Sequence, residues 1–365
     1  MSLDVGIIGL EMSGRTTIFN CLTSMEAGSG RSRQEEHIGI ARVPDSRVDR
    51  LKEMFKSRKA VYGEVKYIDL GASIKNAAKD FTLSGKLLSS LGATDALLCV
   101  VRAFKDEAVP HPQASIDPAR DIEAMELELA FSDMAVIERR LEKLSAQIKS
   151  SRTAERPALE GEAVFLENIK AGLEAGAPLR RQALDEEDLK KISGYQFLSL
   201  KPMLTVLNIG EDELGQARQM EEQLNLRFGD KSHLIVALAG KLEMELAGLD
   251  DESRQAFLDD FQIEEPGLNK VIRTSFDLLG LISFLTTGED ESRAWPIPRN
   301  TSAPQAAGRI HSDIERGFIR AEVVHYDDLV RLGGYAGARK EGVFRVEGKN
   351  YIVQDGDVIN FLFNV

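Results

Sequence analysis

Short apolar runs alternate along the chain with longer stretches in which apolar residues recur every three or four positions. The runs rich in Val, Ile and Leu cover residues 3–8, 65–70, 96–101, 203–207 and 234–238, and residues 38–43 add an alternating strand. Near-continuous apolar runs are typical of strands covered on both faces, and the periodic stretches are typical of amphipathic helices. The pattern therefore predicts an α/β fold with a mainly parallel sheet flanked by helices.

A helical pattern interrupts this series of strands. Apolar side chains stand three or four residues apart, with charged residues between them, over residues 121–151 and again over 159–173. Arg156-Pro157, which lies between the two stretches, is typical of a turn. The pattern predicts two long helices that form a hairpin inserted into the α/β domain, rather than a separate terminal domain.

The last part of the chain has a third pattern. The polar residues 288–293 predict a linker, and a helix at 306–316 is expected among short strands at 294–297, 320–325, 351–353 and 358–365. This order predicts a small α+β module. The predicted domains are an α/β domain of residues 1–120 and 200–280, a helical arm of residues 121–199 and a C-terminal domain of residues 281–365.

Composition limits the classes of function. The chain has 365 residues, which is long enough for two or three domains. Cys21 and Cys99, the only cysteines, stand in apolar segments and offer no disulfide framework, which fits a reducing cytoplasm. With no signal peptide and no membrane-spanning run, we expect a cytoplasmic protein without a membrane partner. The net charge of −13 argues against broad nucleic-acid binding but allows a local basic patch.

Residues 9–17, Gly-Leu-Glu-Met-Ser-Gly-Arg-Thr-Thr, carry the chemistry of the first domain. They lie between a predicted strand and a predicted helix and fit the phosphate-binding pattern G-x-x-x-x-G-K-[ST] except at Arg15. In such a loop backbone amides wrap a phosphate chain at a helix N-terminus, and the hydroxyl of Thr16 is a Mg²⁺ ligand. Arg15 is not a conservative replacement, because guanidinium is broad and forked whereas a lysine amine is a slim point charge. The predicted phosphate site consists of Gly9, Met12, Ser13, Gly14, Arg15, Thr16 and Thr17.

A Ras-like domain built on such a loop needs three further elements. Asp69 ends a predicted strand at the place of the D-x-x-G element and could hold Mg²⁺ through water, although Ala72 replaces the glycine. Asn208 and Glu211 stand at the place of the base-recognition element N-K-x-D, but glutamate leaves a preference for guanine unsupported. Residues 25–40 contain no threonine to act as a first switch. Asp69 and Asn208 also have ordinary structural explanations, as a strand end and a turn residue.

Two long stretches carry a resemblance to a known family. Residues 302–323, which begin Ser-Ala-Pro-Gln-Ala-Ala-Gly-Arg-Ile-His, and the ending Gly348–Val365 resemble the C-terminal TGS domain of the YchF family, the Obg-like ATPases. Weaker similarity spans nearly the whole chain. The resemblance implies a Ras-like P-loop NTPase domain with an inserted α-helical hairpin, or coiled-coil, domain and a C-terminal β-grasp TGS domain.

The resemblance also implies a function. Family members bind ATP or GTP, associate with ribosomes, and carry N-x-x-E with a tendency to favour ATP, a variant that Asn208 and Glu211 match. A histidine ahead of the helical arm is assigned to hydrolysis in the family, and His111 stands at the corresponding place. We therefore expect a nucleotide with Mg²⁺ as ligand and the ribosome or RNA as partner.

The departures from the family lie at the phosphate end of the site. The family has lysine where this chain has Arg15, and Ala72 and Ser73 stand where glycine and a hydrophobic residue are expected. Two functions therefore stay open. One is a slow nucleotide hydrolase whose turnover switches association with the ribosome. The other is a non-hydrolysing binding protein that serves as a scaffold for ribosome, RNA or protein.

Overall fold

The computed structural model describes residues 4–23, 37–70, 85–152, 154–260, 263 and 265–364. The chain forms two compact units. The N-terminal unit consists of Leu3–Gly39 and Lys66–Val271, and the C-terminal unit contains Ile40–Val65 and Ile272–Val365. No helix among the described residues is both long and apolar enough to span a bilayer.

Six of the described strands form the first sheet, in the order β2-β4-β1-β5-β6-β7. They are β1 (Asp4–Gly9), β2 (His37–Arg42), β4 (Glu64–Asp69), β5 (Ala96–Arg102), β6 (Met203–Asn208) and β7 (His233–Leu238). β1 pairs in parallel with β4 and β5, and β6 pairs in parallel with β5 and β7. Every residue of β5 and β6 is buried, as expected for inner strands covered on both faces. The strands predicted from the apolar runs are confirmed.

The helices that follow or precede these strands are α1 (Arg15–Thr23), α3 (Gly85–Gly92), α7 (Ala217–Phe228), α8 (Gly240–Ala247), α9 (Asp251–Asp260) and α10 (Gly267–Leu278). Short 3-10 turns are η1 (Leu179–Arg181), η2 (Ser193–Tyr195) and η3 (Glu211–Gln216). Apolar side chains from β5, β6 and β7 pack with those of α8 in one buried cluster that includes Leu97, Leu207, Ile235 and Leu242.

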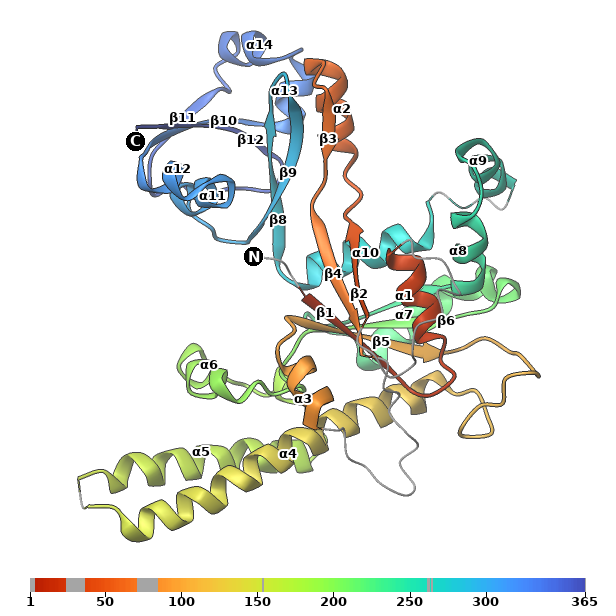
Figure 1. The fold of residues 1–365 in the computed structure, drawn as a ribbon, viewed down its shortest axis with the longest axis vertical. Coiled ribbons are helices and arrows are strands. Elements are labelled where there is room, and N and C mark those ends of the chain that lie inside the picture. Colours follow the sequence, from red (N-terminus) through yellow and green to blue (C-terminus); the bar gives the residue numbers. More distant parts are fainter. Residues whose placement is uncertain are drawn as a thin grey trace. The chain divides into compact units, whose positions relative to one another are not determined.

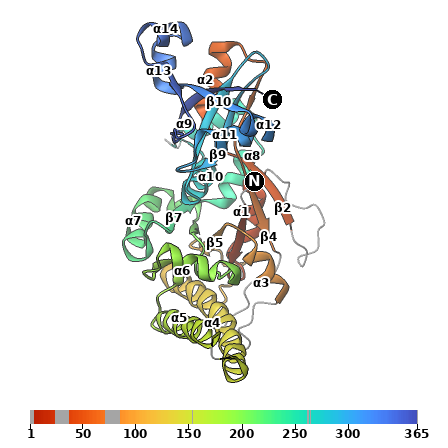
Figure 2. The ribbon, with the colours of Figure 1, turned by 90° about the vertical axis from the view of Figure 1, so that its left-hand side faces the viewer.

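The inserted arm is a helical hairpin, as predicted. It contains α4 (Pro118–Ser150), α5 (Arg156–Glu174) and α6 (Glu186–Ile192), and α4 and α5 lie side by side in Figure 1 and again in Figure 2. Asp117 caps α4 by accepting the Arg120 N–H at 3.1 Å, and a proline follows at the first helical position, where its missing N–H costs nothing. Arg156-Pro157 begins α5 instead of forming the turn, for the same reason.

α4 contributes to two different cores. Its first half buries Ile122, Met125 and Leu129 against the apolar cluster of the first sheet. Its second half buries Ile137 and Leu144 against α5, together with Leu166, Ile169 and Leu173 of that helix. A single helix therefore joins the sheet to the arm without a break.

The second sheet belongs to the C-terminal unit and has the strand order β11-β10-β12-β8-β9-β3. Its strands are β3 (Lys59–Val61), β8 (Leu281–Thr287), β9 (Glu291–Pro298), β10 (Phe318–His325), β11 (Arg345–Glu347) and β12 (Asp357–Phe363). The helices of this unit are α2 (Ser46–Phe55), α11 (Ala303–Ile310), α12 (Ser312–Arg316), α13 (Tyr326–Arg331) and α14 (Tyr335–Lys340). The predicted helix at 306–316 is thus two short helices with His311 between them.

Consecutive residues along a strand of this sheet belong to two different apolar clusters. Ile359 of β12 lies in the cluster with α11, whereas the neighbouring Val358 lies in the cluster with Val48 and Leu51 of α2. The segment 288–293 is not a linker, because its residues close and pair the β8–β9 hairpin. Residues 40–65 enter this unit because β3 pairs in parallel with β9, with Lys59 opposite Glu291.

Candidate functional site

The loop between β1 and α1 contains the residues that the sequence predicts to bind phosphate. Met12 and Gly14 both have left-handed backbone angles, with φ of 62° and 87°. A Cβ atom on Gly14 would lie 2.1 Å from Nδ2 of Asn208, and one on Gly9 would lie 2.6 Å from the carbonyl oxygen of Val100. Both positions therefore need glycine, Gly14 for its angle as well as for its contact.

A buried hydroxyl lies inside this loop. The Ser13 side chain is 2% exposed, and its Oγ makes no hydrogen bond with any residue that the structure describes. Buried hydroxyls in proteins nearly always have a partner, and one at a helix N-terminus is placed for an anion. The loop therefore offers an unsatisfied polar atom where a phosphate oxygen would lie.

Arg15, Thr16 and Asp69 meet at the carboxyl end of β4. Nε of Arg15 lies 3.2 Å from Oδ1 of Asp69, and the Thr16 hydroxyl donates to Oδ2 of Asp69 at 3.4 Å. The Asp69 side chain is 1% exposed and the Arg15 side chain 11% exposed. The two predicted Mg²⁺ ligands are thus brought together, and the arginine that replaces lysine forms an ion pair with one of them.

Asn208 ties the loop to its neighbour in the sheet. Its Nδ2 donates to the carbonyl oxygen of Ser13 at 3.0 Å, and its Oδ1 accepts the Gly240 N–H at 3.1 Å. Glu211 is exposed in the first turn of η3, three residues beyond Asn208. Gly240 was not singled out from the sequence, although its place just after the run at 234–238 is a signal that could have found it.

Asn208→Asp is expected to lower the free energy of unfolding of the whole chain by about 1–3 kcal/mol. Aspartate keeps an acceptor for Gly240, but it places an oxygen against the Ser13 carbonyl with no proton between them. Urea unfolding followed by circular dichroism measures the change. Asn168→Asp, on an exposed position of α5, is the control and should stay within about 0.5 kcal/mol of the natural chain. Equal losses in both variants would contradict the bridging role of Asn208.

His111 lies at the start of the arm. Its Nδ1 accepts the Gln113 N–H at 3.0 Å, which leaves the proton on Nε2, 2.9 Å from Oδ2 of Asp121. The histidine side chain is 5% exposed. Both ring nitrogens therefore have partners within the loop and the first turn of α4, and Asp121 is also held by Arg120. This arrangement fixes the entry into the arm.

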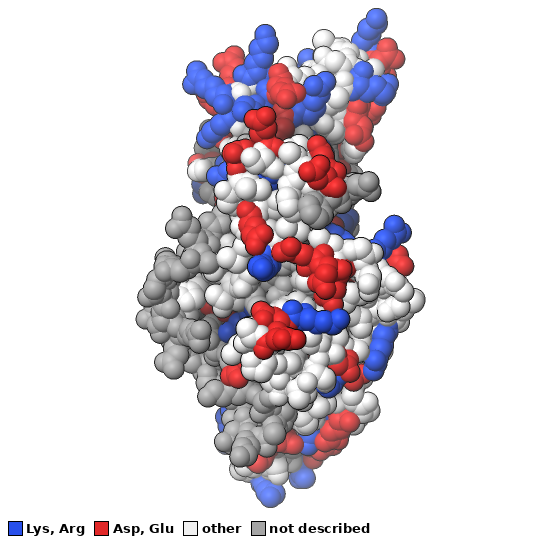
Figure 3. Space-filling view, turned by 90° about the vertical axis from the view of Figure 1, so that its right-hand side faces the viewer, with Lys and Arg blue, Asp and Glu red and all other residues white. Residues whose placement is uncertain are grey.

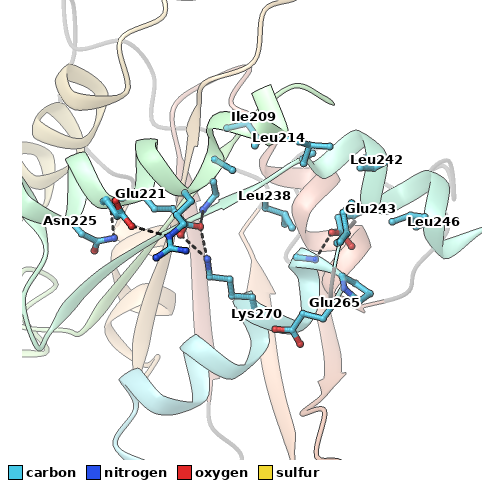
Figure 4. A pocket seen from close by; sticks show the side chains of 18 residues that line it. Ile209, Leu214, Glu221, Asn225, Leu238, Leu242, Glu243, Leu246, Glu265 and Lys270 are labelled. Carbon is cyan, nitrogen blue, oxygen red and sulfur yellow. Dashed lines mark hydrogen bonds and ion pairs between the residues drawn. The ribbon is translucent and has the colours of Figure 1, made fainter. Parts of the chain in front are cut away.

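A cavity of about 510 Å³ lies elsewhere in the N-terminal unit (Figure 4). Leu214, Leu238 and Leu242 give it an apolar lining, and Glu221 and Glu243 are among its acidic residues. Lys270 donates to both oxygens of Glu221 at 2.7 Å, and Glu243 accepts the Gly267 N–H at 2.7 Å. Burial raises the pKa of Glu243 in spite of that hydrogen bond. Because carboxylates repel phosphate, this cavity is poorly suited to a phosphate group.

Several elements of the predicted site lie outside the residues that the structure describes. Residues 24–36 contain most of the segment expected for the first switch, and Ala72 and Ser73 follow Asp69 within 71–84; both ranges lie outside the described residues. Among the described residues no group of three or more His, Cys, Asp and Glu side chains is placed to hold a metal ion.

Comparisons with known proteins agree with the fold. The family model YchF-GTPase_C, described as "Protein of unknown function (DUF933)", matches residues 281–364. The chain is 40% identical to the "Ribosome-binding ATPase YchF" of Bacillus subtilis (strain 168) over 375 residues, covering 100% of both chains. It is 36% identical to the protein of that name from Escherichia coli O157:H7 over 368 residues, again covering 100% of both.

A solved structure gives the same result in three dimensions. The Schizosaccharomyces pombe YchF GTPase superposes with a TM-score of 0.83 at 26% identity, covering 99% of this chain and 98% of that chain. The predicted architecture of a P-loop domain with a helical insert and a C-terminal domain is confirmed. With relatives more than 30% identical over their full length, the chain belongs to the YchF family.

Proposed function

We propose that the chain binds a nucleoside triphosphate at the loop of residues 9–17. The observation that carries this proposal is the loop itself, in which left-handed Met12 and Gly14 lead into α1 and the buried Ser13 hydroxyl has no partner among the described residues. Helix N-termini attract anions, and a phosphate oxygen would satisfy this hydroxyl. The phosphate-binding residues in this proposal are Gly9, Met12, Ser13, Gly14, Arg15, Thr16 and Thr17.

The base and the metal would be held from the neighbouring strands. Asn208, which already contacts the loop, and Glu211 are the proposed base-binding residues, with ATP or GTP as the ligand. Thr16 and Asp69 offer the hydroxyl and carboxylate oxygens that Mg²⁺ prefers, and they would hold the ion once it had displaced Arg15 from Asp69. When bound, the ion neutralises charge on the phosphate oxygens.

The attraction for phosphate would be local. The chain has a net charge of −13, and on the face drawn in Figure 3 the described Lys and Arg side chains are interspersed with Asp and Glu. A polyphosphate would therefore depend on the loop amides and on Arg15 rather than on the field of the whole surface.

We extend the partner of the relatives to this chain. The relatives are named ribosome-binding ATPases, and we propose a cytoplasmic protein that binds the ribosome or its RNA. In this proposal residues 1–120 with 200–280 hold the nucleotide. The arm of residues 121–199 and a TGS domain of residues 281–365 supply the contacts with the partner.

One set of contacts favours static binding over hydrolysis. Arg15 is paired with Asp69, and both ring nitrogens of His111 have protein partners. A histidine that orients water must offer one nitrogen to it, which His111 does only if it leaves Gln113 or Asp121. The non-hydrolysing alternative therefore has a specific structural basis in this chain.

Titration calorimetry with ATP and GTP, followed by phosphate-release measurements, tests the proposal. We expect binding of at least one nucleotide, with phosphate release slower than that of Arg15→Lys by about tenfold or more, because lysine is the natural phosphate ligand of this loop. His111→Ala should change the rate of phosphate release by no more than about twofold, because both nitrogens of the His111 ring are already hydrogen-bonded, to Asp121 and Gln113.

Two results would contradict these expectations. The absence of heat with both nucleotides, in the presence and in the absence of Mg²⁺, would remove the proposed function. A loss of about a hundredfold or more in His111→Ala would make the histidine a catalytic group, since general acid–base groups contribute on that scale.

A further inference from the structure

Arg15 holds the carboxylate that a magnesium ion would use. Its Nε lies 3.2 Å from Oδ1 of Asp69, a side chain that is 1% exposed. The register of the sheet explains why they meet: Asp69 lies opposite Ile7, two residues before β1 ends, and α1 begins at Arg15 just beyond the loop. A buried pair of opposite charges is screened far less by solvent than an exposed one. Arg15 is therefore a fixed positive charge at the metal position.

The second oxygen that magnesium would use is turned toward the same carboxylate. The Thr16 hydroxyl donates to Oδ2 of Asp69 at 3.4 Å. Mg²⁺ demands a nearly ideal octahedron of oxygens and gives up its water reluctantly. An ion that reached Asp69 would have to displace Arg15 or stand next to its like charge. Arg15 therefore already supplies the positive charge beside Asp69 that a bound Mg²⁺ would bring.

A guanidinium group can pair with a carboxylate and attract a phosphate at the same time better than an ammonium group can. It carries five N–H donors in a fixed planar fork, and the Nε atom of that fork lies in the ion pair with Asp69, whereas a lysine concentrates its three donors on a single nitrogen. An arginine can therefore keep its carboxylate partner and still contribute charge to a phosphate, in a way that a lysine cannot match.

We propose that Arg15 replaces Mg²⁺ as the counter-ion of Asp69, so that this chain binds nucleoside di- and triphosphates almost independently of magnesium. This inference rests on the proposed nucleotide binding. The ligand class is a nucleotide free of metal, held by the loop amides, the Ser13 hydroxyl and Arg15. A lysine at position 15 would restore the need for the ion.

The test compares affinities with and without the metal. Titration calorimetry of the full chain with ADP and with a non-hydrolysable ATP analogue is carried out once in excess Mg²⁺ and once in EDTA. For the natural chain the two dissociation constants should agree within about threefold, whereas Arg15→Lys should bind at least about tenfold more tightly with Mg²⁺ than without it. Arg156→Lys is the matched control, because Arg156 forms an exposed pair with Glu160 on the arm, and it should behave as the natural chain does.

Each outcome decides one question. If the natural chain binds with Mg²⁺ but loses tenfold or more in EDTA, this inference is wrong while nucleotide binding stands. If Arg15→Lys is as independent of Mg²⁺ as the natural chain, Arg15 is not the cause and the inference is again wrong. If nothing binds in either buffer, the proposed function fails and this inference fails with it. Should Arg15→Lys not fold, as judged by circular dichroism, the two titrations of the natural chain decide alone.

Discussion

Replacing Gly14 by alanine is expected to weaken nucleotide binding by about two orders of magnitude, which corresponds to about 3 kcal/mol. Two effects combine. The residue has φ of 87°, where a side chain costs about 1–2 kcal/mol, and its Cβ would lie 2.1 Å from Nδ2 of Asn208. Either Asn208 or the loop must move, and overpacking of this kind costs about 1–3 kcal/mol more. The movement would disturb the Ser13 carbonyl that Asn208 holds.

Gly176 offers a matched control for the angle without the collision. Its φ is 84°, but a Cβ there would have no neighbour within 4 Å. Gly176→Ala should therefore lose about 1–2 kcal/mol of stability and keep its affinity for nucleotide. Calorimetric titration of both variants and of the natural chain separates the two effects. If Gly14→Ala bound nucleotide as tightly as Gly176→Ala, the loop would not be the phosphate site.

Glu126→Ala is expected to lower the free energy of unfolding by about 3–5 kcal/mol, the usual cost of breaking a buried ion pair on one side. Oε1 of Glu126 accepts from Arg180 at 2.5 Å, and it lies 3.3 Å from Nδ1 of His233. The Arg180 side chain is 1% exposed, so the variant would leave a buried guanidinium with little more than the Ser199 carbonyl. Urea unfolding followed by circular dichroism gives the value.

A neighbouring glutamate on α4 provides the control. Glu123 accepts from Arg227, but both side chains are more than half exposed. Glu123→Ala should cost no more than about 1 kcal/mol, because solvent screens such a pair. A similar loss in both variants would mean that the Glu126 contacts add nothing beyond an ordinary surface pair.

The same glutamate makes stability depend on pH. Burial alone would raise the pKa of Glu126, but the His233 hydrogen bond and the charges of Arg180 and Arg181 outweigh it, so the pKa is lowered. A carboxyl with a lowered pKa in the folded state stabilises the fold above its ordinary pKa, and this contribution is lost as pH falls through the lowered value. On acidification, the free energy of unfolding of the natural chain should therefore fall more than that of Glu126→Gln. The glutamine side chain of the variant does not titrate.

The sequence predicts the strands of the first sheet because its inner strands are apolar at most positions, a pattern that needs no knowledge of their partners. The entry of residues 40–65 into the second sheet could not be predicted in this way. β3 has only three residues, and it pairs with a strand more than two hundred residues later in the chain. Val48 and Leu51 of the same segment are fully buried against the C-terminal sheet, so a fragment that begins at residue 281 would expose that apolar face.

The sequence predicts only part of the candidate site, for a related reason. The pattern of residues 9–17 predicts which side chains bind a phosphate or a metal. It does not predict which of these side chains contact one another. Arg15 and Asp69 are 54 positions apart in the chain, and their ion pair appears only when the strands are placed side by side. His111 stands at the place that the family implies, yet its partner Asp121 belongs to the next helix.

The continuity of α4 has a mechanical consequence. Its 33 residues form one helix about 50 Å long that begins next to His111 and ends at the far end of the arm. A rigid rod of this length amplifies rotation, since a tilt of about 5° at its base displaces its tip by about 4 Å. Any rotation of α4 at its base, where His111 contacts Asp121, would therefore displace the end of the hairpin by several times the movement at the base.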